Sequence, residues 1–308
     1  MQIYHSLSEF EKTSCKTSVA LGFFDGVHTG HQNVIKRCVD EKKDNLSVVF
    51  TFEKSPASIL ENNKKALLTL NEQKQKIIQG LGADALIFAD FLSVKDISAE
   101  DFVKVILKEK LNAKKVYCGF NYRFGKNAAA DTNSLVSLCK KYDIKVYVSE
   151  EIVYKGLAVS STRIRNSIAK GHIEEANKML GYNFTIFGSV VPGNHIGRTL
   201  DFPTANIMMN NELVMPQFGV YASKVKIEEK EYYAATNIGI HPTVNKKSFP
   251  ICETYLFSYD GFDLYNKYIE CELLHFVRKE QKFSSLKELK LQVEDDKKQI
   301  MKIFDIKN

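Results

Sequence analysis

The stretch that decides the fold of the first half is Val19-Ala-Leu-Gly-Phe-Phe-Asp-Gly-Val-His-Thr-Gly-His-Gln32. It begins as a short apolar strand, turns at Gly22 and Gly26, and enters a helix that carries His28 and His31. Residues three apart lie on one helix face, so both imidazoles point the same way. The first amides of a helix lack internal partners and its dipole is positive there. The stretch therefore predicts a phosphate receptor, and its strand–turn–helix setting disfavours a surface loop with two incidental histidines.

The rest of the first half alternates between apolar strands and amphipathic helices. Strands are predicted at 47–52, 85–89, 115–118 and 145–149, and helices at 31–43, 69–80, 98–110 and 132–142. Thr69 and Glu72 match a capping box at the start of the second of these helices. The alternation indicates a parallel, doubly wound sheet. Ligands of such sheets bind at the carboxyl ends of the strands, where the opening stretch leaves its strand.

Two further segments should reach the same edge of the sheet. In Gly119-Phe-Asn-Tyr-Arg-Phe-Gly125 the aromatic rings can stack on a planar ligand and Asn121 can bond to a ring edge, but an aromatic core turn explains the segment equally well. In Val159-Ser-Ser-Thr-Arg-Ile-Arg165 the hydroxyls, free amides and Arg165 can hold phosphate. The alternative for this second segment is an ordinary helix cap followed by surface arginines. Its occurrence together with the H-x-G-H motif favours phosphate binding.

These three motifs, G-x-F-D-G-x-H-x-G-H, G-x-N-x-R-F-G and S-S-T-x-I-R, resemble the FAD synthetase module of bacterial bifunctional riboflavin kinase/FAD synthetases, which is related to the H-x-G-H nucleotidyltransferases. The resemblance implies that His28 and His31 bind the phosphates of ATP and stabilise the transferring adenylyl group. It implies further phosphate and ATP contacts by Gly22, Phe24, Asp25, Gly26, Gly30, Ser161, Thr162 and Arg165, the last three holding pyrophosphate, and flavin contacts by Asn121, Arg123 and Phe124. Ala130 stands where similar proteins usually have glycine, which puts the shape of the flavin loop in question.

The pattern changes near residue 184, after a helical connector at 167–180. Short segments rich in β-branched and aromatic residues predict an antiparallel sheet or barrel, with strands at 184–191, 204–207, 219–227, 231–238, 252–257 and 268–276 and a terminal helix at 286–304. An apolar stripe that includes Leu286, Ile300 and Ile303 should pack this helix on the barrel. We therefore predict two domains, 1–183 and 184–308.

The candidate binding residues of the second half lie between residues 188 and 206. Gly193 and Gly197 allow a loop whose amides approach a nucleotide. Thr204 and Asn206 are two apart on an extended segment and face the same side; their oxygens suit Mg²⁺. Taken alone, the P-T-A-N segment is better explained as an ordinary strand with two outward polar residues.

A wider set of motifs resembles the riboflavin kinases. It comprises the P-T-A-N element at 203–206, the segments at 216–221 and 237–243, and Arg278-x-Glu-x-x-Phe283. By this resemblance Glu253 is the base that accepts the ribityl hydroxyl proton, Gly193, Gly197 and Arg198 contact ATP, and Thr204 and Asn206 hold the metal. Asn266 replaces a usual glycine, a mild departure because Asn tolerates positive φ.

Composition limits the alternatives. The 308 residues carry a formal net charge of +6, a mild excess that favours small anionic substrates over nucleic acid. The six cysteines form no metal or disulfide pattern, and neither a signal peptide nor a membrane helix is predicted. We expect a cytoplasmic monomer or weak homo-oligomer with no nucleic-acid or membrane partner.

The combined expectation is an α/β protein with a Rossmann-like first domain and a small β-barrel second domain. It would phosphorylate riboflavin to FMN with ATP and Mg²⁺ and then adenylylate FMN to FAD. Two alternatives stay open: a riboflavin kinase whose adenylyltransferase module is inactive, and a flavin- or nucleotide-binding regulator that does no chemistry.

Overall fold

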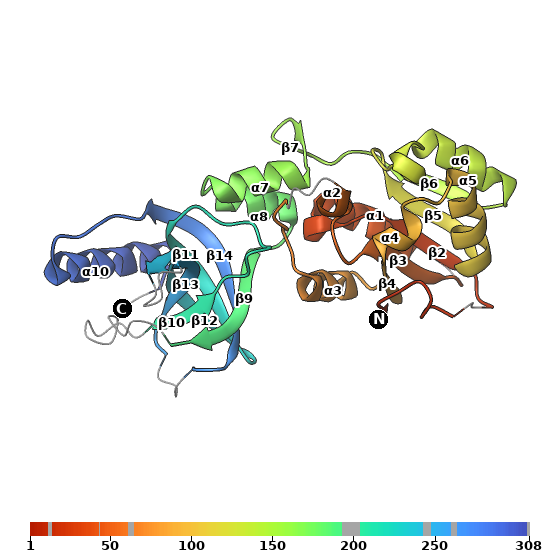
Figure 1. Cartoon of the computed structure of the whole chain (residues 1–308). Coiled ribbons are helices and arrows are strands. Elements are labelled where there is room, and N and C mark those ends of the chain that lie inside the picture. Colours follow the sequence, from red (N-terminus) through yellow and green to blue (C-terminus); the bar gives the residue numbers. More distant parts are fainter. Residues whose placement is uncertain are drawn as a thin grey trace. The chain divides into compact units, whose positions relative to one another are not determined.

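The computed structural model describes residues 1–11, 14–42, 44–60, 65–192, 204–242, 248–259 and 264–306. The chain separates into two compact units, Met1–Ser161 and Thr162–Asn308 (Figure 1). The domain boundary that the change of sequence pattern predicts, between residues 183 and 184, stays a prediction.

The first unit is built on a six-stranded sheet in the order β1-β4-β3-β2-β5-β6. Every neighbouring pair is parallel. The strands are β1 (Gln2–Tyr4), β2 (Thr17–Leu21), β3 (Leu46–Phe52), β4 (Ala85–Ala89), β5 (Ala113–Gly119) and β6 (Lys145–Ser149). This confirms the predicted doubly wound sheet; β1, at the edge, is too short to show a pattern in the sequence.

Side chains on both faces of this sheet are buried. In β2, Val19 and Leu21 join one hydrophobic cluster and Ala20 joins the other. Helices α1 (Thr29–Asp40) and α3 (Asn71–Gly80) supply the cluster around Ala20, whereas η2 (Phe102–Lys110, a π-helix) and α6 (Thr132–Lys141) supply the other. Two covered faces explain why these strands are apolar at nearly every position.

Two helix starts differ from the prediction. His28 is extended and precedes α1, which begins at Thr29. A capping box needs a hydrogen bond from the backbone amide before the helix to a side chain three residues later. At the start of α3 this bond joins the Leu70 amide to Gln73 Oε1 at 2.8 Å, so the predicted capping box of Thr69 and Glu72 is wrong. Thr69 has another role, because its hydroxyl accepts a hydrogen bond from the Gly26 amide. Gly26 lies in the turn between β2 and α1, residues 22–28, which we call the histidine-bearing turn.

Short elements complete the first unit. They are η1 (Asp25–Val27), α2 (Pro56–Leu60), α4 (Phe91–Val94), α5 (Ala99–Asp101), η3 (Lys126–Ala128) and the hairpin of β7 (Val153–Tyr154) and β8 (Leu157–Ala158). The Ser98 hydroxyl caps α5 by accepting from the Asp101 amide at 3.0 Å, as its sequence position predicts.

The second unit is a closed antiparallel barrel in the order β10-β13-β12-β11-β14-β9. Its strands are β9 (Phe184–Val191), β10 (Thr204–Met208), β11 (Gly219–Ile227), β12 (Lys230–Pro242), β13 (Ser248–Leu256) and β14 (Tyr268–Lys279). Helices α7 (Ser161–Ala169) and α8 (Ile173–Leu180) precede it and α10 (Leu286–Ile303) follows it. The predicted barrel with a terminal helix is confirmed.

Both an ion pair and apolar packing attach helix α10 to the barrel. Arg278 donates two hydrogen bonds of 2.7 Å to the buried carboxylate of Asp296. Ile300 is fully buried, whereas Leu286 and Ile303 are exposed, so the predicted apolar stripe is only partly correct. The helix contacts the barrel in its second half, which leaves Leu286 in solvent (Figure 1).

Helix α8 packs on the barrel. Its fully buried side chains are Ile173, Ala176, Met179 and Leu180. Asn177 donates to the Leu273 carbonyl of β14 and accepts from the Phe184 amide, both at 2.8 Å. The helix ends at Gly181, whose φ is 79°.

This packing predicts that a fragment of residues 162–308 is more stable than one of residues 184–308. The shorter fragment loses three large buried side chains, each worth about 2 kcal/mol. Because the chain has no tryptophan, urea unfolding followed by circular dichroism is the suitable measurement. Equal unfolding midpoints for the two fragments would show that α8 contributes nothing to the barrel.

Candidate active sites

The turn after β2 adopts an unusual backbone. Phe24, Gly26 and Val27 have φ values of 52°, 77° and 34°, a region that side-chain-bearing residues rarely occupy. Side chains from outside the turn fasten it: Thr51 Oγ1 donates to the Phe23 carbonyl at 2.8 Å, and the Gly26 amide donates to Thr69 Oγ1 at 3.1 Å. The turn therefore has one defined shape.

The two histidines stack directly after this turn. Their ring centroids are 3.6 Å apart with an interplanar angle of 18°, which confirms that they point the same way. His31 Nδ1 is buried and has no hydrogen-bond partner among the described residues. Burial first, then His28 and Lys74, lowers the pKa of His31 well below its ordinary value, so this ring is neutral at pH 7. Neutral imidazoles beside a helix N-terminus can donate hydrogen bonds to phosphate.

Two glycines of the motif make room for rings. A Cβ on Gly22 would lie 2.7 Å from Phe24 Cε1, and a Cβ on Gly30 would lie 3.2 Å from His28 Cε1. Phe24 itself is buried, and Asp25 is buried with its Oδ1 accepting from the Leu68 amide at 2.9 Å. These four residues thus shape the turn from within.

Ser161 also reaches this turn, since its hydroxyl donates to the Asp25 carbonyl at 3.0 Å. It is the last residue of the first unit, and Thr162 and Arg165 follow it in α7. The structure therefore brings Ser161 together with the histidine-bearing turn, while the pyrophosphate role of all three residues stays a prediction.

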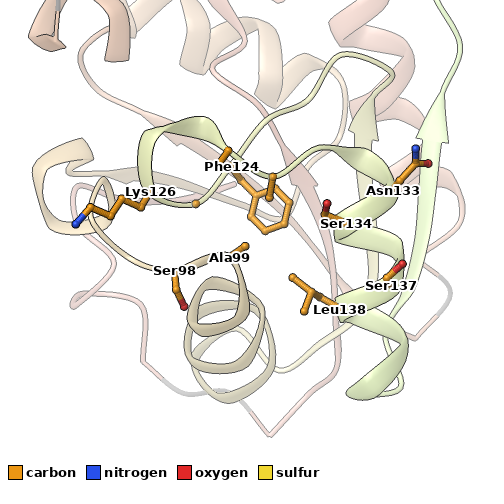
Figure 2. Close-up of a pocket in the computed structure, with 11 residues that line it drawn as sticks. Ser98, Ala99, Phe124, Lys126, Asn133, Ser134, Ser137 and Leu138 are labelled. Atoms are coloured by element: carbon orange, nitrogen blue, oxygen red, sulfur yellow. The ribbon is translucent and has the colours of Figure 1, made fainter.

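The predicted flavin-binding residues of the loop at 119–131 differ in their exposure to solvent. Asn121 and Arg123 are exposed, whereas Phe124 is 5% exposed and packs against Phe102 with ring centroids 5.5 Å apart. Phe124 thus fits the alternative of an aromatic core turn. It also lines a hollow of about 690 Å³ between α5, this loop and α6 (Figure 2).

Ala130 fits its position without strain. Its amide and carbonyl pair with the carbonyl and amide of Phe124 at 3.2 and 3.1 Å, closing the loop as an antiparallel bridge. The positive φ values of this loop fall on Gly125, Asn127 and Ala128 instead. An alanine in place of the usual glycine therefore does not distort the loop.

In the barrel, three predicted residues meet on neighbouring strands. The register pairs Asn206 of β10 with Glu253 of β13. Thr204 Oγ1 donates to Glu253 Oε1 at 2.7 Å. Alternate residues of β13, Cys252 and Thr254, are fully buried, so Glu253 lies on the opposite face of the strand and is only half-buried.

The donor set suits a hard cation. Asn206 is 4% exposed, and its Oδ1 is buried with no hydrogen-bond partner in the part of the chain that the structure describes. A buried amide oxygen without a partner is costly, and a metal bound there would satisfy it. Together with the Thr204 hydroxyl, this amide oxygen fits Mg²⁺, with the Glu253 carboxylate alongside.

Sequence reasoning missed two members of this cluster. Asn237 of β12 pairs with Glu253 from the other side. A Cβ on Gly239 would collide with the Glu280 carboxylate, which places that carboxylate against β12 and near the Asn237 amide. Both residues belong to quoted motifs, but only the strand register shows that Asn237 lies beside Glu253, and only packing brings Glu280 to Gly239.

Part of the predicted kinase site, Gly193, Gly197, Arg198 and Pro203, lies outside the described residues, as does Thr243. Asn266 has a φ of 63°, which confirms that this position needs a residue tolerant of positive φ.

Comparisons with known proteins cover both units. A family model described as FAD synthetase matches residues 10–163, and one described as riboflavin kinase matches residues 180–304. Proteins called bifunctional riboflavin kinase/FMN adenylyltransferase are similar over nearly the whole chain. That of Buchnera aphidicola from Acyrthosiphon pisum is 34% identical over 99% of each chain. That of Bacillus subtilis is 33% identical over 99% of this chain and 98% of its own.

A solved structure is also similar throughout. It is described as a macrolide-efflux protein from Streptococcus pneumoniae, with a TM-score of 0.86 and 29% identity over 96% of this chain and 97% of its own. Among the helices described in the present structure, none has the length and apolarity needed to cross a membrane.

The family is decided by the sequence matches, because the two models together span both halves and the relatives exceed 30% identity along almost their full length. This chain belongs to the bifunctional riboflavin kinase/FMN adenylyltransferase family.

Proposed function

We propose that this chain phosphorylates riboflavin to FMN with ATP and then transfers AMP from a second ATP to FMN, giving FAD and pyrophosphate. The observation that carries the proposal is the presence of two separate sites suited to phosphate chemistry, one in each unit. Stacked His28 and His31 mark the first, and Glu253 bonded to Thr204 beside Asn206 marks the second.

In the kinase reaction Glu253 acts as the general base. Its carboxylate accepts the proton of the ribityl hydroxyl as that oxygen attacks the γ-phosphorus and ADP leaves. The Thr204 hydroxyl, bonded to Glu253 at 2.7 Å, orients the carboxylate. Thr204 and Asn206 would hold Mg²⁺, which neutralises phosphate charge when bound. Gly193, Gly197 and Arg198 contact the nucleotide in this proposal.

In the adenylyl reaction an FMN phosphate oxygen attacks the α-phosphorus of ATP. The bond between the α-phosphorus and the bridging oxygen breaks, and pyrophosphate leaves. His28 and His31 donate to the phosphate oxygens as charge develops, and Ser161, Thr162 and Arg165 hold the pyrophosphate. The described residues around H-x-G-H offer no obvious nucleophile, so the transfer is direct.

The remaining contacts of the adenylyl site are assigned by family. Gly22, Phe24, Asp25, Gly26 and Gly30 form the ATP turn, and Asn121, Arg123 and Phe124 form the flavin loop. We also infer a cytoplasmic monomer or weak homo-oligomer without nucleic-acid partners.

A riboflavin kinase with an inactive adenylyl module is the first alternative. Ala130 is its only support, and the bridge that Ala130 forms with Phe124, without a positive φ of its own, weakens it. A regulator without catalysis is the second. Mere binding does not require a carboxylate aligned with a hydroxyl and an unsatisfied buried amide oxygen.

The direct test is incubation of the pure protein with riboflavin, ATP and Mg²⁺, with the flavins separated by chromatography. FMN should form first and FAD should follow. Accumulation of FMN without FAD would select the kinase with an inactive module, and intact riboflavin would contradict the proposal altogether.

His28→Ala and His31→Ala should each abolish FAD formation and leave FMN formation unchanged. Each removes a donor aimed at developing phosphate charge, and loss of a comparable donor costs about 10²–10³ in rate. His172→Ala serves as the control because this exposed histidine precedes α8 in the second unit. An equal loss of both activities would show that the substitutions act through folding.

Glu253→Gln should lower riboflavin phosphorylation by about 10²–10⁴-fold, because the amide keeps its size but cannot accept a proton. Riboflavin affinity and FAD formation from supplied FMN should change little. Glu229→Gln, at an exposed turn of the barrel, is the matched control. Near-normal phosphorylation by Glu253→Gln would remove Glu253 as the base.

A further inference from the structure

Lys74 is one of the most deeply buried polar residues of the first unit. It lies in α3 and is 2% exposed. Its Nζ donates to the Phe23 carbonyl at 3.1 Å and lies 4.4 Å from the centre of the Phe23 ring. A buried ammonium is costly unless its partners repay the lost hydration. A methionine would fill the same space without the cost of burying a charge. The presence of a charged side chain at this position therefore needs another explanation.

The carbonyl that Lys74 holds begins the histidine-bearing turn. Phe23 is followed by Phe24, Gly26 and Val27 with positive φ, an arrangement unfavourable for a β-branched residue such as Val27. Such strain persists only where the surroundings impose it. Fixing the Phe23 carbonyl therefore fixes the start of the segment that ends at the stacked imidazoles.

The start of α3 and the residues before it act as one clamp on this turn. The Leu68 amide bonds to the Asp25 carboxylate at 2.9 Å, Thr69 Oγ1 accepts from the Gly26 amide at 3.1 Å, and Lys74 reaches Phe23. Three successive parts of the turn are thus held by one neighbouring segment.

The charge of Lys74 also faces the site. Asp25 raises the pKa of this amine, opposing the burial that lowers it to about 8. In turn Lys74 contributes to the low pKa of His31. A fixed positive charge near His31 favours its neutral form, which still carries one N–H donor, and attracts anionic phosphates.

We propose that Lys74 is a positioning residue for adenylyl transfer, whose buried ammonium fixes the turn that presents His28 and His31 to the phosphates of ATP. The inference rests on the proposed function of this site. It goes beyond the motif, since Lys74 lies more than forty residues after the histidines and outside every motif that indicated the site.

The test compares Lys74→Met with Lys76→Met, which removes the same charge from an exposed position of the same helix. With FMN and ATP supplied, Lys74→Met should lower kcat for FAD formation by about 10²-fold, the cost of a small misplacement of reacting groups, and change KM less. Riboflavin phosphorylation should stay at its wild-type rate. Lys76→Met should match the wild type in both.

A purely structural role is distinguished by comparing the fold of the variant with its kcat, and by rescue with a conservative variant. Where circular dichroism shows Lys74→Met to be folded, such a role predicts a wild-type kcat, which would overturn the proposal. Lys74→Gln retains an N–H donor and should recover part of the lost kcat; no recovery would equally overturn it. If Lys74→Met does not fold, Lys74→Gln is compared with the wild type instead.

A second readout does not depend on activity. In the protein without substrate, Lys74→Met should shift the imidazole proton resonances of His28 and His31, and Lys76→Met should not. Unshifted resonances would contradict the positioning role. A wild-type protein that makes no FAD would instead refute the proposed function and leave this measurement to decide on Lys74.

Discussion

The candidate site of the first unit depends on the turn between β2 and α1, whose backbone conformation is unfavourable without partners from other segments. Phe24, Gly26 and Val27 occupy the left-handed region, and their free-energy cost is offset by partners from three places: Thr51 in β3, Thr69 before α3 and Lys74 within it. Because these partners come from the sheet and from a helix that covers it, the site requires the whole α/β core.

The barrel depends on register in a comparable way. Asn206, Glu253 and Asn237 lie opposite one another on three adjacent strands. A slip of one residue would turn Glu253 into the barrel and Thr254 out of it. Inside, hydroxyls of Ser223, Thr236 and Thr254 form a chain of hydrogen bonds of 2.6 and 2.9 Å that pairs only in the observed register. The buried polar network therefore supports the alignment of the outer, reactive face.

Much of this could be predicted from the sequence, because both folds leave strong periodic signals. The first and last residues of β4, β6, β9 and β11 agree with the prediction. Asn266 has the positive φ that was expected of it. Two predictions were wrong, for different reasons. Thr69 resembles a helix cap but serves the histidine-bearing turn. Leu286 continues an apolar stripe beyond the part of α10 that touches the barrel.

The fold classes, the family and the candidate site residues followed from the sequence alone, because local periodicity and motif spacing are properties of the chain. Only the tertiary structure decided which residues support them. Lys74, Asn237 and Glu280 reach their sites from other segments, through a hydrogen bond to Phe23, a cross-strand pair with Glu253 and a close approach to Gly239. Contacts between residues far apart in the chain leave no local pattern, since they depend on how strands and helices pack.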